Sequence, residues 1–233
     1  VSGNKFRKLK YNIVQAKVEN KTQLLTFGGA YSNHIAAVAY AAKENGFRSI
    51  GIIRGDELKS RISDNPTLRF AQKCGMEFDF VSREGYRLKE ERTFVENLKQ
   101  KFGDFYLIPE GGTNELAIKG CEEILTQDDE IFNYICCSVG TGGTISGLIN
   151  SLKPNQKVLG FPSLKGDFLG DEIRKFIKNN CWKLIQEYHF GGYGKVNEEL
   201  IAFINSFLER TGIPLDPIYT GKMVFGVMDL MRA

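Results

Sequence analysis

Short apolar segments alternate with amphipathic segments along nearly the whole chain, and this alternation most constrains its fold. The apolar segments lack an inside-outside alternation of polarity, which is typical of strands buried on both faces of a parallel sheet. Strands and helices in strict turn therefore predict a doubly wound α/β architecture. The expected strands are 23–27, 49–53, 77–81, 105–108, 134–138 and 157–161, and the expected helices are 32–45, 66–74, 88–101, 115–125, 144–152, 170–179 and 198–211.

A glycine-containing turn, Gly111-Gly112-Thr113-Asn114, is the best candidate for a hinge, because glycine pairs tolerate unusual backbone angles. We therefore expect two α/β lobes, a smaller one at 8–110 and a larger one made of 1–7 and 111–233. Each lobe should hold a mainly parallel twisted sheet flanked by helices, with a small-molecule site in the cleft between them. The chain begins at Val1 and ends within a helical pattern, so both ends are expected to be incomplete.

The composition excludes several classes of partner. The chain has 31 Lys and Arg against 28 Asp and Glu, a net charge of +3. Because the charges are interspersed, neither a nucleic-acid-binding arm nor a membrane-surface stripe is predicted. No apolar run reaches the length of a membrane-spanning helix. With two histidines in the chain and no carboxylate cluster at ligand spacing, no metal site is predicted. Five cysteines without a C-x-x-C pair indicate reduced thiols and a cytoplasmic protein.

The stretch Gly140-Thr141-Gly142-Gly143-Thr144 lies between an expected strand and an expected helix. A glycine loop in this position directs backbone N–H groups and the positive end of the helix dipole at one point, which suits a phosphate. Thr141 and Thr144 add hydroxyl donors. The common nucleotide motifs fit poorly, because position 145 is isoleucine rather than glycine and no Gly-Lys-Ser/Thr ending is present. A plain strand-to-helix turn is the alternative.

Ser32-Asn33-His34 follows an expected strand that ends at Gly28-Gly29. Ser32 or Asn33 is well suited to cap the helix that begins near Ile35, and capping alone would explain both residues. However, open α/β sheets bind ligands at the carboxyl edge of their strands. The hydroxyl of Ser32 and the amide of Asn33 are therefore candidate ligand contacts as well.

Lys5 is a candidate reactive amine, although it lies in a cationic run with Arg7, Lys8 and Lys10. Such a run is usually a solvated face. The preceding Gly3-Asn4 indicates a turn that could direct one amine inward as a helix starts. Lysine is the residue that condenses with carbonyl cofactors, once desolvation or a neighbouring cation activates its amine.

Two tyrosines stand beside turns that expose the phenol. Tyr193 lies between glycines, and Tyr219 follows the turn at Asp216-Pro217. A tyrosine hydroxyl can relay protons when a nearby cation lowers its pKa. Surface anchoring by the aromatic ring is the alternative for each.

Taken together, the motifs resemble those of one family, in its order and over nearly the whole chain. They are Gly3–Leu9, Gly28-Gly29 with Ser32-Asn33-His34, Pro109–Gly112, Gly140–Thr144 and Asp216–Lys222. The family is that of 1-aminocyclopropane-1-carboxylate deaminase and D-cysteine desulfhydrase, within the fold type II pyridoxal-phosphate enzymes. The resemblance implies two α/β lobes with pyridoxal 5'-phosphate between them, and usually a homodimer.

The resemblance also implies roles for single residues. Lys5 would be the Schiff-base lysine, Ser32 would face the substrate, and Asn33 would contact the ring hydroxyl of the cofactor. The stretch Gly140, Thr141, Gly142, Gly143 and Thr144 would hold its phosphate. Tyr193 and Tyr219 match the two active-site tyrosines of the family.

Two positions depart from the family pattern. Tyr31 stands where members commonly carry glutamine before the Ser-Asn pair, which changes a wall of the pocket. Thr220 stands where the deaminase proper is expected to have glutamate beside the pyridine nitrogen, and threonine is the residue of the desulfhydrase branch. A carboxylate would keep that nitrogen protonated and deepen the electron sink, whereas a neutral hydroxyl is expected not to.

The expected activity is therefore that of a pyridoxal-phosphate-dependent lyase similar to D-cysteine desulfhydrase. It would act on a small amino acid and release ammonia and a keto acid, pyruvate. One alternative is a 1-aminocyclopropane-1-carboxylate deaminase, which opens the ring and gives 2-oxobutanoate. Two others are an amino-acid racemase and a non-catalytic module that binds a phosphate ligand, since a fold alone does not fix an activity.

Overall fold

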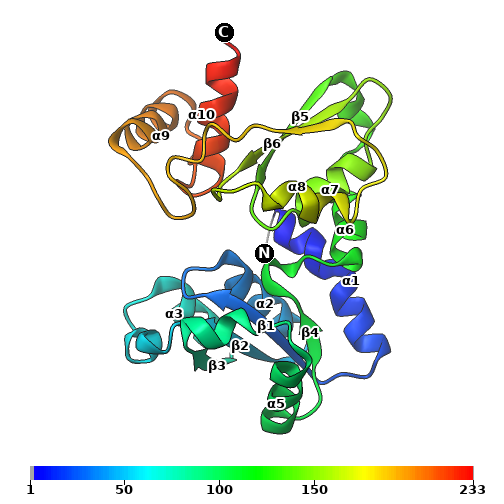
Figure 1. Ribbon diagram of the computed structural model, residues 1–233, viewed down its shortest axis with the longest axis vertical. Helices are drawn as coiled ribbons and strands as arrows, with labels where there is room; N and C mark the ends of the chain where they lie inside the picture. The colour runs from blue at the N-terminus through cyan, green and yellow to red at the C-terminus, as the bar shows by residue number, and fades with distance from the viewer. Residues whose placement is uncertain (1–2, 233) are drawn as a thin grey trace. The chain divides into compact units, whose positions relative to one another are not determined.

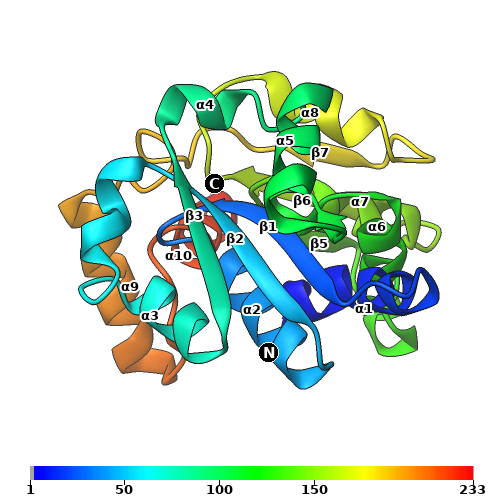
Figure 2. The ribbon, with the colours of Figure 1, turned by 90° about the horizontal axis from the view of Figure 1, so that it is seen from below.

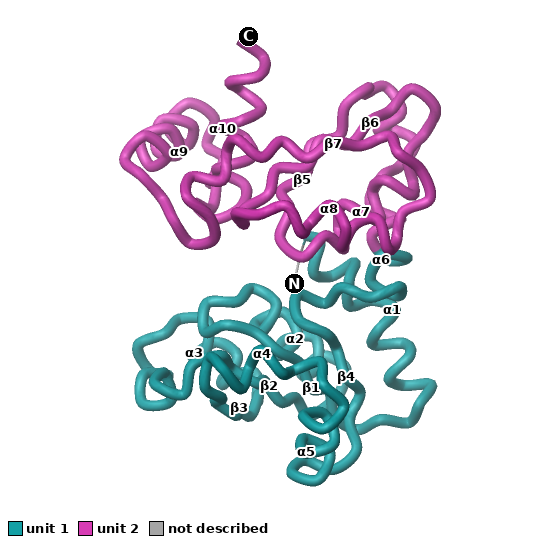
Figure 3. Tube along the Cα trace, in the orientation of Figure 1, with its two compact units in different colours: residues 1–120 teal, residues 121–233 magenta. Residues whose placement is uncertain are grey.

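The computed structural model describes residues 3–232, and the chain divides into two compact units, Val1–Gly120 and Cys121–Ala233 (Figure 3). Residues 3–7 belong to the first unit, because the helix that begins at Asn4 packs against other elements of that unit. The sequence instead predicted lobes of 8–110 and of 1–7 with 111–233, and these lobes stay a prediction. Positions 1, 2 and 233 of the predicted larger lobe lie outside the described residues.

The first unit is built on a four-stranded sheet in the order β3-β2-β1-β4 (Figure 1). Every pairing in it is parallel. The strands are β1 (Gln23–Gly29), β2 (Arg48–Arg54), β3 (Met76–Val81) and β4 (Tyr106–Ile108). The chain order reverses beside β1, which has β2 on one side and β4 on the other. In open α/β sheets, ligands bind beyond the carboxyl ends of the strands at such a reversal.

Helices cover both faces of this sheet (Figure 2). One face carries α1 (Asn4–Val18), α2 (Asn33–Glu44) and α3 (Pro66–Lys73), and the other carries α4 (Arg83–Arg87) and α5 (Arg92–Phe102). Adjacent strand residues point to opposite faces. Leu24 accordingly joins the cluster formed with the first three helices, whereas Leu25 packs with Tyr86 and Leu98 on the other side. Burial on both faces explains the continuous apolar strands and confirms the doubly wound prediction.

The second unit holds a three-stranded parallel sheet in the order β5-β6-β7. Its strands are β5 (Tyr134–Val139), β6 (Lys157–Pro162) and β7 (Trp182–Leu184), and its longer helices are α7 (Gly143–Asn150), α8 (Phe168–Arg174), α9 (Glu198–Thr211) and α10 (Thr220–Leu230). A Cβ at Gly160 would touch Ile145 of α7. The next residue, Phe161, points to the other face, where it approaches Gly226 of α10. Both faces of this sheet are therefore covered.

The remaining elements are short. They are α6 (Glu115–Cys121) and the 3₁₀ segments η1 (Asp56–Arg61), η2 (Glu110–Gly112) and η3 (Gln127–Ile131). Among residues 3–232, no helix combines the length and the apolar character needed to cross a bilayer.

The predicted strands and helices are confirmed, with several differences in their bounds. The helix expected at 115–125 ends at Cys121, and α1 and α10 were not among the expected helices. The helix expected at 88–101 begins at Arg92, and a separate short helix, α4, precedes it. That helix forms because the Ser82 side chain accepts a hydrogen bond from the N–H of Gly85 at 3.1 Å and so caps its first turn. The helix expected at 170–179 ends at Arg174. The strand β7 was not predicted, because three residues are too short to show a period.

Candidate active site

Ser32 and Asn33 lie where β1 ends and α2 begins, beside the reversal of strand order. The hydroxyl of Ser32 accepts a hydrogen bond from the N–H of His34 at 3.2 Å, so Ser32 is the N-cap and Asn33 is the first helical residue. Gly28 permits a close approach of strand and helix, since a Cβ there would lie 2.5 Å from the Ile35 side chain. The predicted cap is confirmed for Ser32. The ligand contacts of Ser32 and Asn33 stay predictions.

Lys5 and Lys8 extend from one face of α1 and share an acceptor. The Nζ of Lys5 donates to the carbonyl oxygen of Gly111 at 3.1 Å, and the Nζ of Lys8 donates to the same oxygen at 2.9 Å. Lys8 is buried and also donates to the hydroxyl of Thr113 at 3.0 Å. Gly111 follows β4 closely, so both amines lie near the carboxyl end of that strand. The cationic run is therefore not a uniformly solvated face.

The turn that supplies this acceptor requires glycine. Gly111 and Gly112 have φ angles of +67° and +71°, in the left-handed region that side chains disfavour. A Cβ at Gly112 would also lie 3.0 Å from Cε1 of His34. The hinge that the sequence predicted at this turn is thus a tightly packed feature of the first unit.

His34 is buried beneath this turn in a defined tautomer. The hydroxyl of Thr26 donates its proton to the carbonyl oxygen of Ile108 at 2.8 Å. It must therefore accept the 2.8 Å hydrogen bond that joins it to His34, so Nε2 carries the hydrogen and Nδ1 has a lone pair. Within the described part of the chain, Nδ1 has no hydrogen-bond partner. Burial, and then the charges of Lys5 and Lys8, hold the pKa of His34 well below its ordinary value.

The depressed pKa of His34 predicts a loss of stability in mild acid. Below a pH of about 6.5 the unfolded imidazole binds a proton that the folded one refuses, so unfolding becomes more favourable. We expect the free energy of unfolding to fall by up to about 1.4 kcal/mol per pH unit from this group. Denaturant titrations between pH 7 and pH 5 measure it. This fall in the free energy of unfolding should vanish in His34→Gln, which keeps a donor for Thr26. It should remain in His189→Gln. An unchanged slope in His34→Gln would contradict the assignment.

In the second unit, the predicted phosphate loop joins β5 to α7. Gly142, with φ +84°, is the N-cap, and Gly143 is the first helical residue. A helix start leaves its first N–H groups without intrahelical acceptors, and the dipole makes that end positive. A Cβ at Gly142 would lie 3.2 Å from Ile173, and a Cβ at Gly140 would lie 3.3 Å from the Tyr219 ring. The glycines thus allow Ile173 and the Tyr219 ring to approach the backbone of the loop more closely than a side chain would permit.

Ser163, which sequence reasoning missed, lies at the same edge. It follows β6, and its N–H donates to the carbonyl oxygen of Val139 at 2.9 Å, directly before the glycine loop. Its side chain is fully buried, and its hydroxyl has no partner among residues 3–232. A buried hydroxyl without a partner is costly in a folded protein. No sequence signal distinguished this serine from others.

Tyr193 and Tyr219 come together in the second unit. Their ring centroids are 6.1 Å apart in an edge-to-face arrangement. Lys222 holds the two segments, because its buried Nζ donates to the carbonyl oxygens of His189 at 2.8 Å and Gly192 at 2.9 Å. Burial lowers the pKa of Lys222, and the Asp216 carboxylate opposes that shift. Lys222 was part of the motif only by resemblance, and its role in holding the Tyr193 loop was missed.

Thr220 begins α10 and is tied to Asp216. The Thr220 hydroxyl lies 2.6 Å from Oδ2 of Asp216, and the N–H of Asp216 donates to that hydroxyl at 2.9 Å. Asp216 also accepts hydrogen bonds from the N–H groups of Ile218, Tyr219 and Thr220. The segment that carries Tyr219 and Thr220 is therefore rigidly built.

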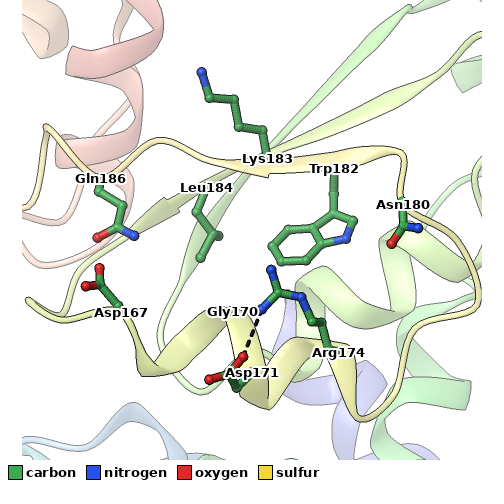
Figure 4. Close-up of a pocket in the computed structure, with 9 residues that line it drawn as sticks. All are labelled: Asp167, Gly170, Asp171, Arg174, Asn180, Trp182, Lys183, Leu184 and Gln186. Carbon is green, nitrogen blue, oxygen red and sulfur yellow. Dashed lines mark hydrogen bonds and ion pairs between the residues drawn. The ribbon is translucent and has the colours of Figure 1, made fainter.

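An open hollow of about 620 Å³ lies elsewhere in the second unit, between α8 and β7 (Figure 4). Arg174 crosses its floor, bound to Asp171 at 2.8 Å and lying 5.8 Å from the Trp182 ring centroid. The lining residues are Asp167, Gly170, Asp171, Arg174, Asn180, Trp182, Lys183, Leu184 and Gln186. None of them is a predicted site residue. The described residues also contain no group of three or more His, Cys, Asp and Glu side chains arranged to hold a metal.

Comparison with known proteins gives a consistent result. The family model described as "Pyridoxal-phosphate dependent enzyme" matches residues 1–233. A Thermotoga maritima protein, provisionally named a 1-aminocyclopropane-1-carboxylate deaminase, is 30% identical and aligns over 99% of this chain and 80% of its own. An Arabidopsis thaliana protein is named a bifunctional D-cysteine desulfhydrase/1-aminocyclopropane-1-carboxylate deaminase. It is 28% identical and aligns over 98% of this chain and 64% of its own.

A solved structure supports the same family. It is a homologue of 1-aminocyclopropane-1-carboxylate deaminase, with a TM-score of 0.84 and 29% identity over 99% of this chain and 75% of that one. The residues of each unit, taken by itself, are of the kinds that pyridoxal phosphate needs. The Lys5 amine lies at a strand-order reversal in the first unit. A glycine loop at a helix start and the unpartnered buried hydroxyl of Ser163 lie in the second unit. The chain is therefore a pyridoxal-phosphate-dependent enzyme of the 1-aminocyclopropane-1-carboxylate deaminase/D-cysteine desulfhydrase family.

Proposed function

We propose that the enzyme converts D-cysteine, or a closely similar small amino acid, to pyruvate and ammonia with release of sulfide. The observation that carries this proposal is the Lys5 amine at the carboxyl end of β4, together with Thr220 where a deaminase is expected to have glutamate. Support comes from relatives whose names include D-cysteine desulfhydrase, in Arabidopsis thaliana and Klebsiella pneumoniae.

Lys5 is proposed to hold the cofactor covalently and later to move a proton. Pyridoxal phosphate, when bound, supplies an electron sink that weakens bonds at the substrate α-carbon. The Lys5 amine, exchanged for the substrate amine, then removes the α-proton. Lys8 and the Gly111 carbonyl keep the Lys5 side chain directed to one place, since both amines bind the same oxygen. Departure of the β-thiol as hydrogen sulfide would follow the loss of the α-proton, and a water molecule would then replace the nitrogen to give pyruvate and ammonia.

Other residues are proposed to bind and orient. The backbone N–H groups of the segment Gly140–Thr144 hold the phosphate, with the hydroxyls of Thr141 and Thr144. Asn33 contacts the ring hydroxyl of the cofactor, and Thr220 contacts its ring nitrogen. Ser32, Tyr193 and Tyr219 face the substrate, where a hydroxyl can bind the carboxylate or donate a proton to a leaving group.

Two further properties, the oligomeric state and the cellular location, are also proposed. The enzyme is proposed to be a homodimer, as is usual in the family. It is also proposed to be cytoplasmic, because the sequence holds five cysteines and no C-x-x-C pair.

Ring opening of 1-aminocyclopropane-1-carboxylate is the second candidate, because the Thermotoga maritima relative carries that name. This substrate has no α-hydrogen, so Lys5 could not begin the reaction by removing one. A base or nucleophile among Ser32, Tyr193 and Tyr219 would have to open the ring. The product would be 2-oxobutanoate rather than pyruvate.

Keto-acid release by cofactor-loaded enzyme tests the proposal. D-Cysteine, L-cysteine and 1-aminocyclopropane-1-carboxylate are supplied separately, and pyruvate, 2-oxobutanoate, ammonia and sulfide are measured. We expect equal amounts of pyruvate, ammonia and sulfide from D-cysteine. Release of 2-oxobutanoate from the cyclopropane at a higher rate would assign the second candidate instead. A change of enantiomer in the recovered amino acid, without keto acid, would show a racemase and contradict the proposal.

A further inference from the structure

We infer that Asp216 fixes the direction of the Thr220 hydroxyl, so that Thr220 can only accept a hydrogen bond from the cofactor and thereby keeps its pyridine nitrogen protonated. This inference rests on the proposed function, which places Thr220 at that nitrogen. Asp216 acts through Thr220 and is thus a positioning residue. The inference concerns residues of the second unit alone.

The Asp216 carboxylate is held by four donors at the start of α10. Its Oδ1 accepts the N–H groups of Ile218 at 2.9 Å and Tyr219 at 2.7 Å. Its Oδ2 accepts the N–H of Thr220 at 3.0 Å and lies 2.6 Å from the Thr220 hydroxyl oxygen. A separation of 2.6 Å is typical of a hydroxyl that donates to an ionised carboxylate.

The ionisation of Asp216 follows from these contacts. Burial by itself would raise the pKa of this carboxyl group. The hydrogen bonds from the Thr220 hydroxyl and from the N–H groups of Thr220, Tyr219 and Ile218 outweigh burial and lower it. Asp216 is therefore an acceptor only, and the hydroxyl proton of Thr220 belongs to the bond between them.

The remaining capacity of the Thr220 hydroxyl is then a single lone pair. A hydroxyl has one proton and two acceptor sites. Its proton goes to Oδ2 of Asp216, and the N–H of Asp216 occupies one acceptor site at 2.9 Å. Any additional partner of this oxygen must itself donate a hydrogen. A pyridine nitrogen donates only when it is protonated, so binding there favours the protonated ring.

This consequence reverses the expectation drawn from the sequence, that a neutral hydroxyl would leave the ring nitrogen without its proton. A threonine hydroxyl bound to a half-buried carboxylate would then favour the same protonation state of the ring as glutamate. Thr220 and glutamate would then differ in reach and shape rather than in the protonation state they impose. The electron sink is accordingly expected to be deeper here than beside a threonine hydroxyl that donates to the ring nitrogen.

The test is the protonation state of the ring nitrogen, read by ¹⁵N NMR of enzyme loaded with pyridoxal phosphate labelled at that nitrogen. Wild-type enzyme is expected to give the resonance of a protonated pyridine at neutral pH. In Asp216→Asn the new amide can donate to the Thr220 oxygen, which frees the hydroxyl proton to point at the ring. We expect that variant to give the resonance of an unprotonated pyridine.

Two further variants complete the comparison. Thr220→Val removes the hydroxyl without changing charge, and it is also expected to lose the protonated signal. Asp229→Asn is the matched control: Asp229 lies on the same helix and accepts a hydrogen bond from the Tyr188 hydroxyl at 2.8 Å. It removes one carboxylate of α10 and should leave the protonated signal in place.

The outcomes separate this inference from the function on which it rests. An unprotonated ring in the wild type, or a protonated ring in both Asp216→Asn and Thr220→Val, would overturn the inference while the cofactor assignment stands. Visible absorption from the lysine-bound cofactor, recorded on the same samples, reports on the assignment itself. Its absence from wild-type enzyme would refute both.

Discussion

Replacing Lys5 with alanine is expected to lower the rate of keto-acid release by about 10³-fold or more, the size of effect that follows loss of a positioned acid-base group. Lys8 lies close enough to share the Gly111 carbonyl, but it is buried and bound to Thr113 as well. Lys8 is therefore not expected to replace Lys5 in the reaction. Lys5→Ala is also expected to lose the visible absorption of the lysine-bound cofactor, because the proposed function has the Lys5 amine form that bond.

The control for this substitution is Lys17→Ala on the same helix. Lys17 is exposed, and its amine donates to the side chain of Asn45 at 2.9 Å, far along α1 from Lys5. It should retain wild-type rate and absorption. Keto-acid release by Lys5→Ala at a rate near that of the control would contradict the assignment of Lys5.

Among glycine-to-alanine substitutions in the first unit, Gly120→Ala is expected to lower the free energy of unfolding the most. A Cβ there would overlap the carbonyl oxygen of Arg7 and lie 2.9 Å from its carbonyl carbon, both backbone atoms of α1. A backbone cannot rotate aside as a long side chain can, so α1 and α6 must separate. Overpacking of this kind costs about 3 kcal/mol. Denaturant unfolding followed by circular dichroism measures the loss.

Gly170→Ala provides the comparison, because Gly170 also lies in a helix and has room. A Cβ there meets only the end of the Arg174 side chain, at 3.4 Å. Since alanine favours helix, its stability should stay equal or rise slightly. Gly120→Ala should also weaken cofactor binding, because α1 carries Lys5. Equal stability of the two variants would show that α1 and α6 are not packed as closely as described.

The strands were predictable because burial on both faces leaves a local mark. Leu24 packs on one face of the sheet and Leu25 packs on the other, so both positions are apolar. The apolar run that contains them was recognised from the sequence alone. The helix α9 was predicted with both of its ends, since Asn197 caps it and Gly212 terminates it in the left-handed region. Local signals of this kind need no knowledge of distant residues.

The surroundings of the candidate site were not predictable in this way. Lys8 and Lys222 look like solvent-facing charges in the sequence, yet both are buried and bound to carbonyl oxygens. Their acceptors come from residues far along the chain, and no periodicity reports such a contact. His34 and Ser163 were missed as buried polar groups for the same reason. The family motifs nevertheless identified Lys5, Thr220 and the glycine loop, whose site roles stay predictions.

The acceptor shared by Lys5 and Lys8 is a main-chain atom, so neither natural variation nor ordinary mutagenesis can remove it. Every amino acid carries a carbonyl oxygen, so no codon change at position 111 can delete the acceptor itself. A codon change can only misplace it, by refusing the positive φ that glycine adopts there. Variation at this position is thus filtered by backbone geometry rather than by side-chain chemistry. Removing the carbonyl oxygen of Gly111 without distorting the backbone would require chemical synthesis of an altered main chain.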